Sequence, residues 1–205
     1  MVTIIHPAIG ADLPFDARRF QSPLDIRVNP GYFGAMATSS SKPTGLSPLP
    51  PVVVPPNGGA VFSAVGDVYR LLAGSAQTGG AYALLESRVL PGGGPPPHLH
   101  TREEEAFFVL EGEISFFLED QKIAARPGSF VHIPRGMVHA FKNESTKPAR
   151  MLIQTSPAGF ESFIQEIAHP LPSFDSSPAP VTQQDVAKLL AVAPKYGIEV
   201  RLPQA

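Results

Sequence analysis

Four residues have the types and the spacing of a metal site. His98 and His100 are separated by one residue, and Glu105 and His139 follow further along the chain. If residues 98–100 form a strand, both imidazoles lie on one face, because side chains alternate with a period of two. Three neutral imidazoles and one carboxylate suit a divalent transition metal such as Fe, Ni, Cu, Co, Mn or Zn. We therefore predict one metal ion held by these four side chains.

Each candidate ligand also has a plainer structural explanation. The two neighbouring histidines could face solvent, and a histidine in the position of His139 is often a core or surface residue. Glu103, Glu104 and Glu105 form an acidic run, which usually marks a solvated turn. We prefer Glu105 as the ligand, because it is in phase with the apolar side chains that follow it, and Glu104 is the alternative. We expect Glu103 and Glu104 to lie in a solvated turn.

The other three histidines do not belong to this group of candidate ligands. We expect His132 to have a structural role, and we expect His6 and His169 to lie on the surface.

The residues around the candidate ligands resemble the two motifs of the cupin superfamily. The first motif, G-x5-H-x-H-x(3,4)-E-x6-G, is matched by Gly92, His98, His100, Glu105 and Gly112. The second motif, G-x5-P-x-G-x2-H-x3-N, is matched by Gly128, Pro134, Gly136, His139 and Asn143. The resemblance covers about residues 82–156 and includes one motif pair, so the chain resembles a monocupin. The spacing to Gly112 also favours Glu105 over Glu104, and we expect Asn143 to bond a turn backbone rather than the metal.

The resemblance implies an all-β fold, a double-stranded β-helix or jelly-roll barrel. The runs 103–113 and 155–163 are similar to bacterial monocupins that resemble quercetin 2,3-dioxygenase. This implies a metal-dependent dioxygenase acting on O₂ and a small aromatic or enolic compound such as a flavonol, with Glu105 as the general base. Two alternatives stay open, a non-oxidative isomerase or decarboxylase and a non-catalytic protein that binds small molecules, because fold does not settle function.

We expect the substrate pocket to have apolar walls inside the barrel. The predicted wall residues are Tyr82, Leu84, Phe107, Val109, Phe116 and Phe141. The alternative for the aromatic residues is ordinary filling of a small barrel by its own side chains.

Short apolar runs between turn residues predict the strands that must position these side chains. They are residues 68–73, 81–90, 106–110, 114–118, 122–125, 130–133, 138–142 and 149–155. Many short strands at this spacing are typical of an antiparallel sandwich or barrel.

Two helices are predicted after the strands. Ser156 is a candidate cap, and the apolar residues Phe160, Phe163, Ile164 and Ile167 follow at helical spacing. A second helix is expected to begin after Thr182 and to end at Pro194, with its apolar stripe on Val186, Leu189, Leu190 and Ala193.

The predicted organisation has three parts. Residues 1–60 form a Pro-rich extension, residues 61–156 the barrel, and residues 157–205 a helical segment packed on the barrel. The extension is either a disordered arm or an arm that reaches a second subunit, in which case Val52–Val54 could pair as an edge strand. By analogy with cupins we expect a homodimer.

Composition excludes several other classes of protein. The chain has 205 residues, 16 Lys+Arg against 18 Asp+Glu, and no cysteine. We therefore expect no nucleic-acid partner, no disulfide and no thiolate site. The apolar runs are too short to span a membrane, and the N-terminal residues lack the pattern of a signal peptide, so we expect no membrane association and a cytoplasmic location.

Overall fold

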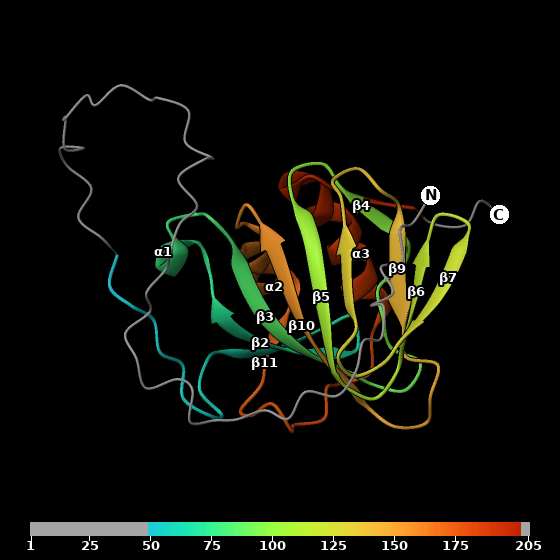
Figure 1. Ribbon diagram of the computed structural model, residues 1–205, viewed down its shortest axis with the longest axis horizontal. Helices are drawn as coiled ribbons and strands as arrows, with labels where there is room; N and C mark the ends of the chain where they lie inside the picture. Colours follow the sequence, from blue (N-terminus) through green and yellow to red (C-terminus); the bar gives the residue numbers. More distant parts are fainter. Residues whose placement is uncertain (1–48, 202–205) are drawn as a thin grey trace, which may run out of the picture. The chain divides into compact units, whose positions relative to one another are not determined.

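The computed structural model describes residues 49–201, which form two antiparallel β-sheets that face each other (Figure 1). The larger sheet has the strand order β11-β1-β2-β3-β10-β5-β8, and the smaller sheet has the order β12-β4-β9-β6-β7. The strands of the larger sheet are β1 (Val61–Ala64), β2 (Asp67–Ala73), β3 (Ala83–Val89), β5 (Glu104–Glu111), β8 (Phe130–Ile133), β10 (Ala149–Ser156) and β11 (His169–Pro170). Those of the smaller sheet are β4 (His98–His100), β6 (Ile114–Leu118), β7 (Gln121–Ala125), β9 (His139–Lys142) and β12 (Ile198–Val200). The predicted all-β jelly-roll barrel is confirmed.

All eight predicted strands are present, and each end lies within two residues of the prediction. Residues 98–100 do form a strand, β4, as the argument for two imidazoles on one face requires. The short strands β1, β11 and β12, of four, two and three residues, were not predicted. Both β11 and β12 come from the C-terminal segment, which therefore extends the two sheets as well as supplying helices.

The core lies between the sheets, and β10 shows most clearly how alternation along a strand builds it. On β10, Ala149, Met151, Ile153 and Thr155 point inward and are buried. The ring of Phe107 on β5 meets the rings of Phe116 and Phe141 from the smaller sheet, with centroids 5.1 and 5.8 Å apart. These edge-to-face contacts join the two sheets.

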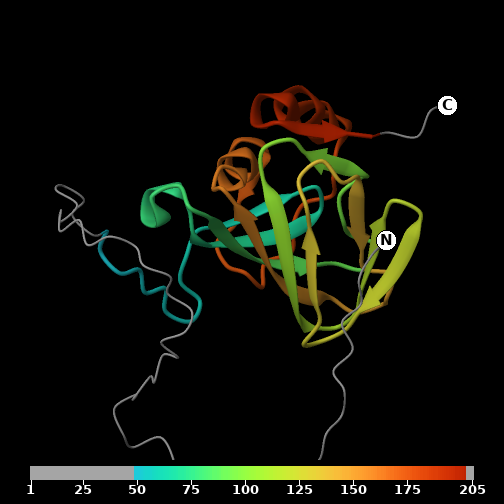
Figure 2. The ribbon, with the colours of Figure 1, turned by 45° about the horizontal axis from the view of Figure 1, so that its top comes forward.

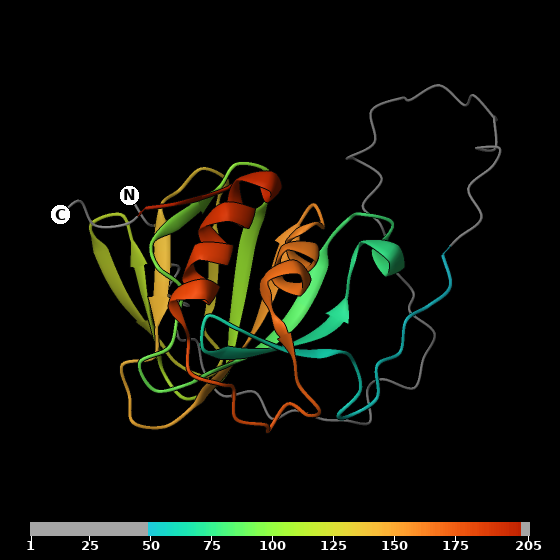
Figure 3. The ribbon, with the colours of Figure 1, turned by 180° about the vertical axis from the view of Figure 1, so that it is seen from behind.

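Helices α2 (Phe160–Ile167) and α3 (Gln183–Val192) lie side by side across the open side between the sheets (Figures 2 and 3). The predicted apolar face of α2 is confirmed, since its four members are all buried. The predicted cap of α2 is wrong, because Ser156 ends β10 and Gly159 is the residue before the helix. The predicted cap of α3 is confirmed, with Thr182 Oγ1 accepting from the backbone N–H of Asp185 at 3.2 Å.

The remaining elements are short. Helix α1 (Ser75–Thr78) precedes β3, and the 3₁₀ helix η3 (Ala193–Tyr196) follows α3. Of the apolar stripe predicted for α3, Leu189 and Ala193 are buried, whereas Val186 and Leu190 are exposed.

Residues 1–48 and 202–205 lie outside the described residues, so most of the predicted N-terminal extension does too. Val52–Val54 is described and belongs to no strand of this chain. The three-part division, the homodimer and the location in the cell stay predictions. Among residues 49–201, no helix has the length and apolar character needed to cross a membrane.

Candidate metal centre

The fold brings the four predicted ligands to one point. His98 and His100 come from β4, Glu105 from β5 and His139 from β9. His98 and His139 are direct partners in the β4–β9 pairing, and β5 reaches them from the opposite sheet. One ligand atom from each of the four lies within 4.8 Å of the others, and all four residues are buried. Strand alternation therefore places the imidazoles on one face, as the sequence predicted.

Glu105 is the centre of the group. One of its oxygens, Oε2, lies 2.7 Å from Nε2 of His139 and 3.4 Å from Nε2 of His100. On their other side, the Nδ1 atoms of His98 and His139 each bond a backbone carbonyl at 3.0 Å, that of Pro96 and that of Met137 respectively. A proton on Nδ1 leaves the lone pair of Nε2 free, which is the form in which imidazole binds a metal.

The donor set fits a divalent transition metal. It consists of three imidazoles and one carboxylate, and Nε2 of His100 is buried without a hydrogen-bond partner in the described structure. A buried polar atom without a partner is costly, and a bound cation would satisfy it.

Burial and charge act differently on the members of the group. Burial, reinforced by the neighbouring His139, lowers the pKa of His98 to about 3 against the attraction of Glu105. Burial would also lower the pKa of His100, but Glu105 and Glu103 outweigh it and raise the pKa above 6.5. Burial would raise the pKa of Glu105, but His100 and His139 lower it to about 2. Glu105 is therefore ionised at neutral pH.

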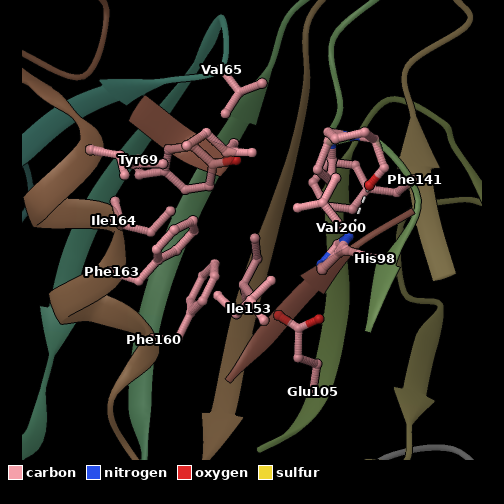
Figure 4. Close-up of a pocket in the computed structure, with 15 residues that line it drawn as sticks. Val65, Tyr69, His98, Glu105, Phe141, Ile153, Phe160, Phe163, Ile164 and Val200 are labelled. Atoms are coloured by element: carbon pink, nitrogen blue, oxygen red, sulfur yellow. Dashed lines mark hydrogen bonds between the residues drawn. The ribbon is translucent and has the colours of Figure 1, made fainter. Parts of the chain in front are cut away.

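An apolar pocket opens beside the metal group (Figure 4). It leaves about 50 Å³ for the centres of water-sized molecules, within about 550 Å³ of space between atoms that is partly open solvent. In Figure 4, Tyr69 and the α2 side chains stand on one side, with Phe141 and His98 on the other. The lining consists of Val65, Tyr69, Pro95, Pro96, His98, Glu105, Phe141, Ile153, Phe160, Phe163, Ile164, Ile167, Leu189, Ile198 and Val200.

The lining differs from the predicted one. Of the six predicted wall residues, only Phe141 lines this pocket. Phe107, Val109 and Phe116 are fully buried and fill the barrel, which was the alternative explanation. Tyr82 is exposed, and Leu84 lies on the outer face of β3, because it is out of phase with the inward residues Ala83 and Leu85. The prediction missed the α2 residues because the pocket forms only when this helix packs against the sheets.

The acidic run 103–105 does not behave as one solvated turn. Glu104 is exposed and pairs with His132 at 3.0 Å on the outer face of the larger sheet. Glu103 was expected to be solvated as well, but it is buried against His100, so that expectation is wrong. No periodicity could have indicated this, since Glu103 lies in the turn before β5.

The other predicted positions have plain outcomes. Asn143 donates to the carbonyls of Val89 and Lys147 at 2.9 and 2.7 Å, so it bonds turn backbone as expected. His169 is exposed and pairs with Asp185, and His6 lies outside the described residues.

The comparisons with known proteins agree with this geometry. Residues 85–154 match the family described as Cupin domain. Residues 85–154 of this chain therefore form a cupin domain. The match contains β4, β5 and β9, the three strands that carry the candidate ligands.

Among curated proteins, this chain is similar to a quercetin 2,3-dioxygenase of Bacillus subtilis, with 30% identity over 105 residues. It is also similar to a rhicadhesin receptor of Pisum sativum, with 33% identity over 111 residues. These matches cover 50% and 51% of this chain but only 30% and 48% of the relatives, so the chain spans less than half the length of either.

Among solved structures, KdgF from Halomonas sp. is 18% identical with a TM-score of 0.44. That match covers 49% of this chain and 91% of KdgF.

Proposed function

We propose that this protein is a metal-dependent dioxygenase acting on a small aromatic or enolic compound such as a flavonol, with O₂ as the second substrate. One observation supports this most directly. His98 and Glu105, two members of the metal group, line a pocket that is otherwise almost entirely apolar. A flat apolar molecule with one oxygen substituent would fit such a pocket with its oxygen toward the metal group and its rings against the apolar walls.

His98, His100, Glu105 and His139 would hold the metal, for which Fe, Ni, Cu, Co, Mn and Zn are all candidates. A bound metal would supply Lewis acidity, which lowers the pKa of a substrate hydroxyl. Glu105 is ionised and lines the pocket, so its carboxylate would accept the hydroxyl proton as a general base.

The pocket walls would orient the substrate and exclude water. Phe141 on one side and Phe160 and Phe163 on the other offer aromatic surfaces for a planar ring. Tyr69 is the one other polar side chain of the lining, and burial, together with the charges of Asp67 and Glu105, raises its pKa well above 10. Its hydroxyl therefore keeps its proton and would donate a hydrogen bond to a second oxygen of the substrate.

The similarity to the Bacillus subtilis dioxygenase supports the same reaction class. A non-oxidative isomerase or decarboxylase and a binding protein without turnover are the outcomes that the following experiment separates from it.

The experiment combines metal analysis with oxygen consumption. We expect the purified protein to contain near-stoichiometric metal by inductively coupled plasma mass spectrometry, and to consume O₂ with flavonols in an oxygen electrode. A His98→Ala/His139→Ala double variant should lose both, whereas His132→Ala, which changes an exposed histidine outside the group, should keep both. Bound metal without O₂ consumption for any flavonol or enol would reject the dioxygenase in favour of the other two classes.

A further inference from the structure

The three imidazoles of the candidate centre are not held in the same way. His98 and His139 each bond the carbonyl of the residue two positions earlier through Nδ1, at 3.0 Å. These bonds fix the ring orientation and place the proton on Nδ1. His100 makes no such bond to a carbonyl, so its orientation needs another source.

A carboxylate faces the free Nδ1 of His100. Oε2 of Glu103 lies 3.5 Å from it, slightly beyond a normal hydrogen bond. Both side chains are buried, with 2% and 5% of their surfaces exposed. Neither of these two atoms has a hydrogen-bond partner in the described part of the chain. A buried carboxylate is rare unless it is paired, and the imidazole of His100 is the partner that Glu103 faces.

The start of helix α2 encloses this pair. A Cβ at Gly159 would lie 3.2 Å from Oε1 of Glu103, so the residue before the helix sits directly against the carboxylate. The ring of Phe160 packs edge-on against the ring of His100, with centroids 5.5 Å apart. Glu103 therefore has little room to turn away from His100.

We propose that Glu103 is a positioning residue that orients His100 for metal binding. Its carboxylate would accept a hydrogen bond from Nδ1–H of His100 and so direct Nε2 toward Glu105 and the metal. A carboxylate, an imidazole and a metal in line form a common arrangement, in which the outer carboxylate contributes to affinity without touching the ion. The inference rests on the proposed metal site, but it does not depend on the identity of the substrate.

The neighbouring glutamates supply a matched pair of variants. Glu103→Gln keeps the shape of a buried side chain and removes its charge, whereas Glu104→Gln makes the same change on an exposed residue. The probe is Co²⁺, whose visible absorption reports ligand geometry, and affinity is measured by competition with a chelator.

We expect Glu103→Gln to weaken Co²⁺ binding by about 10-fold and Glu103→Ala by up to about 100-fold, the range typical of outer carboxylates. The absorption spectrum of bound Co²⁺ should change in both variants, and Glu104→Gln should match the wild type in affinity and spectrum. Thermal unfolding of the metal-free proteins shows whether a variant binds Co²⁺ more weakly because it is less stable or because His100 is no longer held in place.

Glu103→Gln with wild-type affinity and spectrum would overturn the inference, even if the variant unfolds at a lower temperature. A wild-type protein that binds no Co²⁺ would overturn it together with the metal site. Tight Co²⁺ binding that depends on Glu103, in a protein that consumes no O₂, would support the inference while rejecting the dioxygenase.

Discussion

His98 and His100 lie two residues apart on one strand, yet their surroundings shift their pKa values in opposite directions. Burial, reinforced by His139, keeps His98 neutral, with a pKa of about 3. His100 lies between Glu105 and Glu103, which overcome the effect of burial and raise its pKa. In the metal-free protein His98 is therefore ready to bind a metal, whereas His100 must first lose a proton.

This difference predicts a pH-dependent metal affinity. The pKa of His100 in the metal-free protein lies above 6.5, so protons compete with the metal near neutral pH. We expect the logarithm of the Co²⁺ association constant to rise by up to about one per pH unit below this pKa, and to level off above it. Chelator competition between about pH 6 and pH 9 measures this dependence, with His132→Ala to exclude an effect of the exposed histidine. An association constant that is independent of pH over this range would contradict the prediction.

The strands and helices reach their positions through a few turns that require glycine. Gly112, between β5 and β6, and Gly128, before β8, both have positive φ angles, of 75° and 89°. A Cβ at Gly112 would lie 2.8 Å from the Cβ of Ala149 on β10, whereas a Cβ at Gly128 would meet nothing within 4 Å. The first glycine is required by conformation and by packing, and the second by conformation alone.

The two glycines therefore predict two different costs. Gly128→Ala should lower the free energy of unfolding by about 1–2 kcal/mol, the cost of the left-handed backbone. Gly112→Ala should lower it by roughly 1–3 kcal/mol more, because β10 or the turn must move to admit the methyl group. Urea unfolding of the two variants and the wild type tests this order, and equal losses would show that the turn relaxes without disturbing β10.

Asp67 links distant parts of the folded chain. It begins β2, is fully buried, and accepts a hydrogen bond from the backbone N–H of Leu90 at 3.0 Å. A Cβ at Gly93 would lie 2.2 Å from its carboxylate, so the loop between β3 and β4 passes directly over it. Burial raises the pKa of Asp67 to about 7, although the backbone N–H groups of Leu90 and Gly94 partly offset it.

Because the folded state holds this proton more tightly than the unfolded state, stability should fall as the pH rises from about 4 to about 7. The loss attributable to Asp67 is at most about 4 kcal/mol, from three pKa units at about 1.4 kcal/mol each. Asp67→Asn keeps an acceptor oxygen and cannot ionise, so it should lack this loss. Urea unfolding of both proteins at several pH values, with a chelator present, measures the difference. A constant difference in unfolding free energy from pH 4 to pH 8 would disprove the raised pKa.

The metal ligands and most of the strands could be predicted from the amino-acid sequence alone. His98, His100, Glu105 and His139 could be chosen because strand alternation and the motif spacings are local properties, readable over a few residues. The same local information predicted the apolar face of α2 and the cap of α3, since helical spacing and capping need only short stretches of sequence.

Only the tertiary structure decided what surrounds the metal group. The pocket lies between side chains of both sheets and of α2 and α3, so its lining depends on packing between segments more than 100 residues apart, such as those that carry Val65 and Ile198. Glu103 and Glu104 are adjacent acidic residues with no local feature to separate them, yet one is buried beside His100 and the other is exposed. Sequence patterns report which face of an element is apolar, but the position of α2 over the sheets determines which polar side chain loses contact with water.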